Sequence, residues 1–174
     1  MTAVGKVLAG VRGVATGADG RFAIENLPAG EVTLVASATS MLPAEYGQAR
    51  YGAPGAMIAL TEGAFQSVDM VLTRAARIRG TVSGGPNDRE GTVTLARADA
   101  PGTALRSVTL QRSQSRFTFS GLQPGDYIVS WTSRAKPSPI LRSETITLAA
   151  GDDVSSVELR IAVLAAEYPV RGSD

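Results

Sequence analysis

The sequence contains neither histidine nor cysteine among its 174 residues. Folding cannot supply a missing side chain, so thiol nucleophiles, disulfides and every catalytic dyad or triad that needs an imidazole are excluded. Zinc sites built from cysteine and histidine are excluded for the same reason. Many enzyme mechanisms are therefore excluded for this chain.

The chain also lacks an excess of charge of one sign, because it has 17 basic and 16 acidic residues and only 19% of it is charged. This balance is not typical of nucleic-acid-binding proteins. No apolar run approaches the roughly 20 residues that a membrane helix needs. The opening residues MTAVGKVLAG also lack the long apolar stretch of a signal peptide. We therefore expect no nucleic-acid partner, no membrane insertion and no signal peptide in this chain.

Residues branched at Cβ are abundant, since valine, isoleucine and threonine together account for 38 positions. Their stiff χ1 angles suit a pleated strand better than a helix. Hydrophobic residues make up 44% of the chain, which is ordinary for a globular protein. The composition thus favours an all-β globular fold.

The chain contains an internal repeat. Residues 21–36 read RFAIENLPAGEVTLVA, and residues 116–131 read RFTFSGLQPGDYIVSW, at a constant offset of 95. Apolar residues alternate on both sides of the proline and glycine, a pattern that predicts two half-buried strands joined by a sharp turn. In this register Trp131 faces the core.

A second correspondence joins residues 58–74 to residues 146–162, and both segments end in an alternating pattern that predicts a closing strand. The repeat is therefore about 90 residues long, the size of a small β-sandwich domain. We expect one sandwich module at 1–74, a second at 75–165 and a tail at 166–174.

The two modules differ at their starts. The second opens with IRGTVSGGPNDREGTVTLARA, two predicted strands around a loop, whereas the first has room for only one strand of that pair. We expect the first module to lack its opening strand at an edge of the sandwich, where unpaired backbone groups attract another segment. The C-terminal stretch 163–174 is one candidate for this place, and a free tail is the alternative.

These residues resemble a known family. Asp19-Gly20-Arg21-Phe22 with Leu27-Pro28-Ala29-Gly30 resembles the carboxypeptidase regulatory-like domain, a prealbumin-like sandwich of seven strands. The second module departs from the pattern, because Gln114-Ser115 stands where the family has Asp-Gly. The resemblance implies a fold of two tandem prealbumin-like or Ig-like antiparallel β-sandwich domains, the first lacking its opening strand.

The resemblance also bears on function and location. Such modules serve as spacers, binding platforms or regulatory appendages, and residues 41–63 are similar to an inter-strand loop found in large envelope proteins of soil bacteria. It implies a non-catalytic structural or interaction module of a larger bacterial protein, exported to the periplasm, the outer envelope or the extracellular space. The implied partners are other domains of the parent protein or envelope proteins.

The segment 40–56 is the candidate binding site. It is longer than most connections in compact domains, and such loops are often functional. Tyr46, Gln48, Arg50 and Tyr51 offer aromatic rings with amide and guanidinium donors, which suit a carbohydrate or a peptide ligand. In the alternative interpretation, residues 41–42 and one tyrosine cap the sandwich, and the rest is solvated.

Two motifs that carry chemistry elsewhere are interpreted as structural here. Ser133 and Lys136 form an S-x-x-K pattern, which needs a helix to align the two side chains, but prolines at 137 and 139 favour an extended segment. Asp152 and Asp153 lack the spacing of a calcium loop. We therefore expect no enzyme activity, no catalytic residue, no metal site and no cofactor.

Overall fold

The computed structural model describes residues 2–7, 10–84, 90–134 and 140–161. The chain divides into two compact units. Unit 1 comprises Met1–Arg77, Ser120–Pro124 and Ala149–Asp152, and unit 2 comprises Ile78–Phe119, Gly125–Leu148 and Asp153–Asp174.

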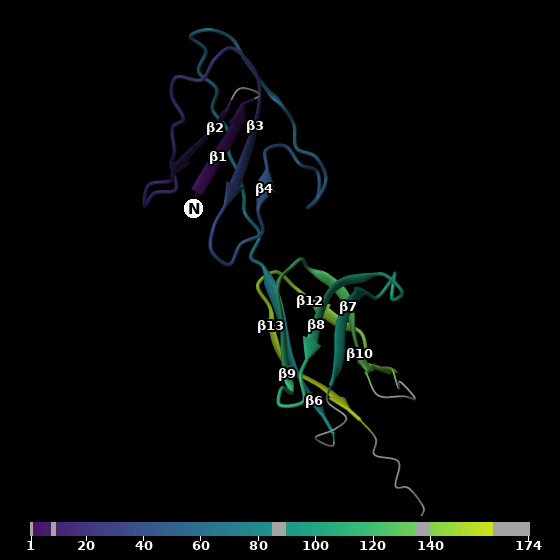
Figure 1. The fold of residues 1–174 in the computed structure, drawn as a ribbon. Helices are drawn as coiled ribbons and strands as arrows, with labels where there is room; N and C mark the ends of the chain where they lie inside the picture. The colour runs from purple at the N-terminus through teal and green to yellow at the C-terminus, as the bar shows by residue number, and fades with distance from the viewer. Residues whose placement is uncertain (1, 8–9, 85–89, 135–139, 162–174) are drawn as a thin grey trace, which may run out of the picture. The chain divides into compact units, whose positions relative to one another are not determined.

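Every regular element among the described residues is a β-strand (Figure 1). These residues accordingly include no helix of a length and apolarity that could cross a membrane. Lys136 and the stretch 163–174 lie outside the described residues.

Unit 1 contains one antiparallel sheet. Its strand order is β2-β1-β3-β4, and β5 pairs with the other end of β3. The strands are β1 (Thr2–Val7), β2 (Gly10–Ala15), β3 (Gly30–Ser37), β4 (Ala44–Glu45) and β5 (Ile58–Leu60).

Unit 2 contains two sheets. The first has the order β11-β10-β7-β8 with β12 paired to β10, and the second, most of which lies in unit 2, has the order β13-β6-β9. The first sheet consists of β7 (Gly91–Arg97), β8 (Ala104–Leu110), β10 (Gly125–Ser133), β11 (Ile140–Arg142) and β12 (Ile146–Leu148), and the second of β6 (Ala76–Ser83), β9 (Arg116–Leu122) and β13 (Asp153–Arg160). The fold is thus an all-β, antiparallel sandwich.

The five-stranded sheets of the two units share one pairing register. Val32 of β3 is paired with Ile58 of β5, and Tyr127, which lies 95 residues after Val32, is paired with Ile146 of β12. The registers of β1 with β3 and of β7 with β10 agree in the same way. The sequence repeat is therefore also a repeat of strand pairing, in which β1 corresponds to β7, β2 to β8 and β3 to β10.

The strand that unit 1 lacks is a middle strand. No described strand of unit 1 corresponds to β6, and β6 lies between β13 and β9 in unit 2. The expectation of a gap at an edge was wrong, because β6 has a neighbour on each side. The expectation that residues 1–16 hold one strand of the opening pair agrees with β1, the counterpart of β7, and the same residues also hold β2, the counterpart of β8.

The same gap explains a second error. Residues 21–27 and 68–72 alternate like strands but form none. Their counterparts β9 and β13 are the two neighbours of β6 in its sheet, and neither segment of unit 1 pairs with a described strand.

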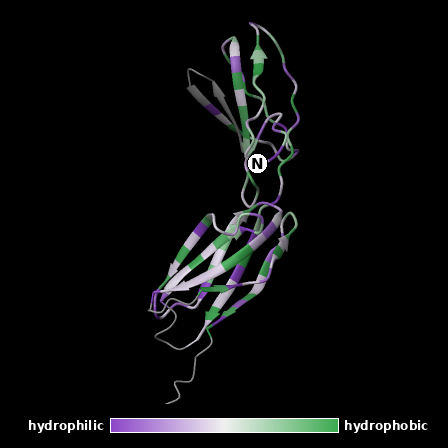
Figure 2. Cartoon of the chain, turned by 90° about the vertical axis from the view of Figure 1, so that its right-hand side faces the viewer, coloured by the Kyte–Doolittle hydropathy of each residue, from purple (hydrophilic) through white to green (hydrophobic). Residues whose placement is uncertain are grey.

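Both units bury hydrophobic side chains between or beneath their strands. In unit 2, Trp131, Tyr127 and Ile78 are almost completely buried, and Trp131 is 0% exposed, as its register predicted. Figure 2 shows the alternation of hydrophobic and hydrophilic residues along these strands. In unit 1, the buried residues among those whose burial is described include Val32, Leu34, Ala36, Leu42 and Ala44.

Candidate binding site

The loop that follows β4 is closed at its base by backbone hydrogen bonds. The amide of Tyr46 donates to the carbonyl oxygen of Leu34 in β3 (2.9 Å), and the amide of Ala56 donates to the carbonyl oxygen of Tyr46 (2.7 Å). Tyr46 therefore joins the outgoing and returning ends of the loop to the sheet. Gly47 and Gly52 adopt positive φ angles of 68° and 77°, which a glycine tolerates and most residues do not.

Side chains hold the interior of the loop. The carboxylate of Glu45 accepts a hydrogen bond from the amide of Gly55 (2.7 Å), and the carbonyl oxygen of the Gln48 side chain accepts one from the amide of Glu45 (2.9 Å). Gly55 has no room for a side chain, because an added Cβ would overlap Glu45 and the carbonyl oxygen of Tyr46. These contacts give the loop a defined shape.

The loop and residues 69–71 and 73 line a hollow of about 370 Å³. All four residues predicted from the sequence line it: Tyr46, Gln48, Arg50 and Tyr51. The alternative interpretation is also correct in part, since Leu42 is buried and Met41 half-buried. The segment 40–56 thus contributes both a buried side chain, Leu42, and exposed ones, such as Tyr51.

The hollow combines an aromatic surface with polar groups of both charges. Tyr51 is 39% exposed, and Tyr46 is half-buried. The guanidinium of Arg50 makes no hydrogen bond or ion pair with any described residue, and the same is true of the carboxylate of Asp69, which also lines the hollow. The Gln48 carbonyl is already engaged, which directs its amide nitrogen to other acceptors. These groups can stack on a ring and can both donate and accept hydrogen bonds.

The sequence interpretation missed the lining residues that lie outside the loop. Asp69, Val71 and Thr73 alternate with the half-buried Val68, Met70 and Leu72 along one extended segment. Val71 is 87% exposed, which is unusual for a valine at the rim of a hollow. The period-two pattern that placed one set of residues toward the core also places the other set outside, so the signal was present in the sequence.

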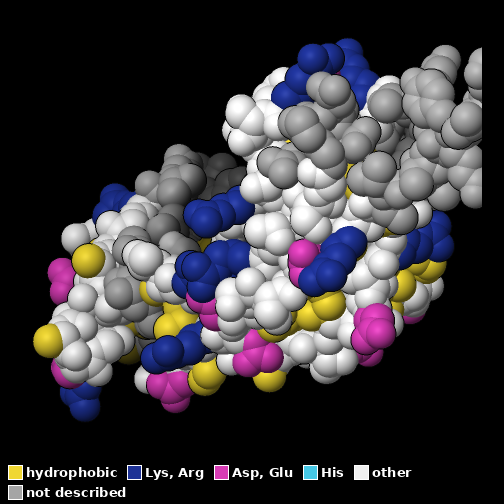
Figure 3. Space-filling view, turned by 90° about the horizontal axis from the view of Figure 1, so that it is seen from below, with side chains coloured by type: hydrophobic (Ala, Val, Ile, Leu, Met, Phe, Trp, Pro, Cys, Tyr) yellow, Lys and Arg dark blue, Asp and Glu magenta, His cyan; other side chains and the backbone are white. Residues whose placement is uncertain are grey.

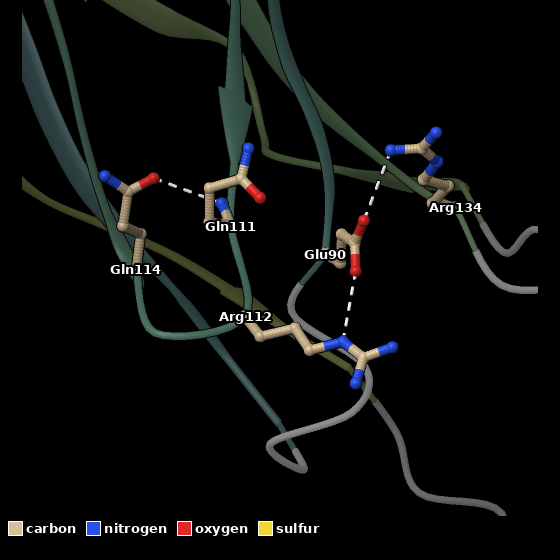
Figure 4. A network of polar contacts seen from close by, with 5 residues as sticks. All are labelled: Glu90, Gln111, Arg112, Gln114 and Arg134. Atoms are coloured by element: carbon tan, nitrogen blue, oxygen red, sulfur yellow. Dashed lines mark hydrogen bonds and ion pairs between the residues drawn. The ribbon is translucent and has the colours of Figure 1, made fainter.

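A second polar cluster lies at one end of the five-stranded sheet of unit 2 (Figure 4). The carboxylate of Glu90 forms ion pairs with the Nε atom of Arg112 (3.1 Å) and an Nη atom of Arg134 (3.2 Å). The amide of Arg134 also donates to the Glu90 carbonyl oxygen (2.9 Å). Figure 3 shows basic side chains on this side of the molecule in several separate groups with acidic ones nearby. The cluster joins strand ends, and its charges are already partly neutralised.

The remaining sequence motifs have structural partners. Ser133 is the last residue of β10 and is buried, so it lies on a strand and not on the helix that an S-x-x-K site needs. Asp153 forms an ion pair with Arg79 (2.9 Å), and the carboxylate of Asp152 accepts a hydrogen bond from the amide of Ala149 (2.7 Å). Within the described ranges, no three acidic, histidine or cysteine residues gather in a way that could hold a metal ion.

Comparisons with known proteins add little. No protein-family model matches the chain, and no similar sequence is found among curated proteins. One solved structure, the Bacillus anthracis TIE protein, aligns over 92% of this chain and 30% of its own, with a TM-score of 0.37 and 12% sequence identity. The chain thus spans less than a third of the structure that it matches.

Proposed function

We propose that this chain is a non-catalytic interaction module of a larger exported or cell-envelope protein, and that it binds a polysaccharide in the hollow of unit 1. One observation carries the proposal: two segments distant in sequence bring Tyr46, Tyr51, Arg50 and Asp69 to the lining of one hollow. Binding surfaces commonly combine amphipathic aromatic rings with a few oriented polar groups.

A sugar fits these groups for chemical reasons. The face of a sugar ring is apolar and packs on a tyrosine ring, while its hydroxyls both donate and accept hydrogen bonds. The Arg50 guanidinium offers donors only, and the Asp69 carboxylate offers acceptors only. Because neither group is engaged by another described residue, a ligand breaks no existing contact when it binds them.

The experiment is a binding screen of the full chain against immobilised bacterial polysaccharides, followed by affinity measurements on variants. Tyr51→Ala and Arg50→Ala are each expected to weaken binding about tenfold or more, the effect typical of aromatic and arginine anchors. Phe65→Ala removes a fully exposed ring of unit 1 that does not line the hollow, and Arg116→Ala removes an exposed guanidinium from β9. These two control variants should bind like the original chain.

Three results would contradict the proposal. The hollow is not the binding surface if Tyr51→Ala and Phe65→Ala lose affinity equally. A peptide library that binds while no polysaccharide does would replace the proposed ligand class with peptides. If neither class binds, the remaining interpretation is a spacer.

A further inference from the structure

The residues that line the hollow of unit 1 carry more negative than positive charge. Among the described lining residues, Glu45 and Asp69 are acidic and Arg50 is basic. The same imbalance holds for the surrounding chain, since residues 30–73 contain four acidic residues and one basic residue. A ligand that approaches this part of unit 1 therefore meets a negative field, which attracts cations and repels anions.

Both carboxylates have accepting capacity left for a ligand. The Oε2 atom of Glu45 accepts the hydrogen bond from the Gly55 amide, and its Oε1 atom has no partner among the described residues. The carboxylate of Asp69 is exposed and has no partner among them either. An ionised carboxylate offers about four acceptor sites and no donor. A ligand group that donates several hydrogen bonds therefore suits these side chains.

The tyrosines of the hollow favour the same sign of charge. The face of an aromatic ring is the negative part of its quadrupole, so a cation placed over it is attracted. Tyr46 and Tyr51 both line the hollow, and Tyr51 is 39% exposed, which leaves its ring open to a ligand. An anionic group would be drawn to Arg50 and repelled by Glu45 and Asp69. The lining therefore suits a cationic ligand better than an anionic one.

We propose that the polysaccharide bound in the hollow contains amino sugars whose amines are free and protonated, and that Asp69 selects them. The inference rests on the proposed function, because it specifies the ligand of the same site. A protonated amine donates three hydrogen bonds and accepts none, which matches a carboxylate. The hydroxyls and ring oxygen of the same sugar supply the acceptors that the Arg50 guanidinium needs. An acetyl group on the amine removes the charge, and an acidic sugar reverses it.

The test compares sugar oligomers of equal length that differ in their charged group. The probes are a β-linked glucosamine oligomer, its fully N-acetylated form and a β-linked glucuronic acid oligomer. Each is titrated against the full chain at a mildly acidic pH that keeps the amines protonated. We expect the glucosamine oligomer to bind about fivefold more tightly than its N-acetylated form, the upper range for one exposed ion pair. The glucuronic acid oligomer should bind most weakly.

Two further measurements assign this preference to charge and to one residue. The preference should disappear as the ionic strength rises from about 0.05 M to about 0.5 M, because salt screens exposed charges. Asp69→Asn keeps the size of the side chain and removes its charge, so this variant should bind the glucosamine and N-acetylglucosamine oligomers equally. Glu62→Gln is the matched control, because Glu62 is exposed in the same part of the chain and does not line the hollow. This control should keep the preference.

The outcomes separate a failure of amine selection from a failure of the polysaccharide site. If the N-acetylated or the acidic oligomer binds as tightly as the glucosamine oligomer and Tyr51→Ala still weakens binding, amine selection is wrong and the polysaccharide site stands. If Asp69→Asn and Glu62→Gln change the preference equally, Asp69 is not the selecting residue. A lysine oligomer that binds as tightly as the glucosamine oligomer would replace the amino sugar with a basic peptide. If none of the sugar oligomers binds at concentrations up to about 1 mM, both this inference and the proposed function are wrong.

Discussion

Phe22 and Phe117 occupy the same position of the internal repeat, yet Phe117 is 3% exposed and Phe22 is only half-buried. Leu72 and Leu159 form a second such pair, since Leu159 is buried and Leu72 is not. The sequence around each residue alternates in the same way in both units. The burial of these side chains therefore depends on something outside their own segments, namely the strand between them.

The comparison shows how much of a sandwich depends on one middle strand. In the sheet β13-β6-β9, β6 pairs with two neighbours and supplies the buried side chains of Ala76, Ile78 and Val82. In unit 1 the five-stranded sheet is complete, with unchanged register, although no described strand takes the place of β6. A sheet can thus form beside an incomplete partner layer, but the segments that flank the gap cannot become strands.

The largest expected difference is in hydrogen exchange. Amides of β13 should exchange only through unfolding of unit 2, which corresponds to about 5 kcal/mol or more, whereas amides of residues 65–72 should show almost no protection. Exchange followed by mass spectrometry or NMR measures both segments in one sample. Equal protection of the two segments would show that unit 1 has a partner strand after all.

The second prediction compares two truncations. Phe117→Ala should destabilise unit 2 by about 3 to 5 kcal/mol, because it leaves a cavity in a closed core. Phe22→Ala should cost unit 1 about 1 to 2 kcal/mol, since a half-buried ring loses less contact with the protein.

Each unit offers its own probe for this experiment. Trp131 is the single tryptophan and lies in the core of unit 2, so its fluorescence during urea unfolding reports on that unit. It should not respond to Phe22→Ala, whose effect appears in the exchange of β3 amides. A large shift of the Trp131 transition in Phe22→Ala would mean that the units do not unfold separately.

The third prediction concerns the crowded glycine of the middle strand. Gly80→Ala should destabilise unit 2 by about 1 to 3 kcal/mol, because the new methyl group must displace Phe117 or the β13 backbone. Gly102→Ala is the matched control, as an added Cβ there meets nothing within 4 Å. Equal urea midpoints for the two variants would argue against close packing of β6 between its neighbours.

The smallest expected effect is the pH dependence of stability that comes from Glu158, an exposed residue of β13. Glu158 corresponds to Val71 in the repeat, and hydrogen bonds from Arg160 and Ser83 hold the pKa of its carboxyl below the ordinary value. The folded-state pKa is therefore lower than the unfolded one. The contribution to stability is present at pH values above the unfolded-state pKa and is lost as the pH falls through the folded-state pKa.

An NMR titration of the Glu158 carboxyl carbon tests this. In the Arg160→Ala variant its midpoint should move upward, because the hydrogen bond that lowers the pKa of this carboxyl most is removed. An unchanged midpoint would show that the pair is not formed in solution.

Much of the fold could be predicted from the sequence, and the reason is physical. Alternation has a period of two, so a shift of one residue would turn every apolar side chain of a strand to the wrong face. The offset of 95 between residues 21–36 and 116–131 therefore carried the pairing register with it. Alternation does not reveal whether a neighbouring strand exists, because that strand comes from elsewhere in the chain, and the strands predicted at 21–27 and 68–72 were wrong for this reason.

Only the loop side of the candidate site could be predicted from the sequence. Tyr46, Gln48, Arg50 and Tyr51 lie in one long loop, where composition and length are sufficient signals. Asp69 and its neighbours reach the same hollow from a segment some 20 residues further along the chain, and only the folded chain brings the two together.

The segment from Val68 to Thr73 belongs to two surfaces at once. Val68 and Leu72 point toward the core of unit 1, while Asp69 and Thr73 line the hollow, and adjacent residues of an extended backbone cannot reorient independently. Any shift of this backbone therefore alters the core of unit 1 and the wall of the hollow together.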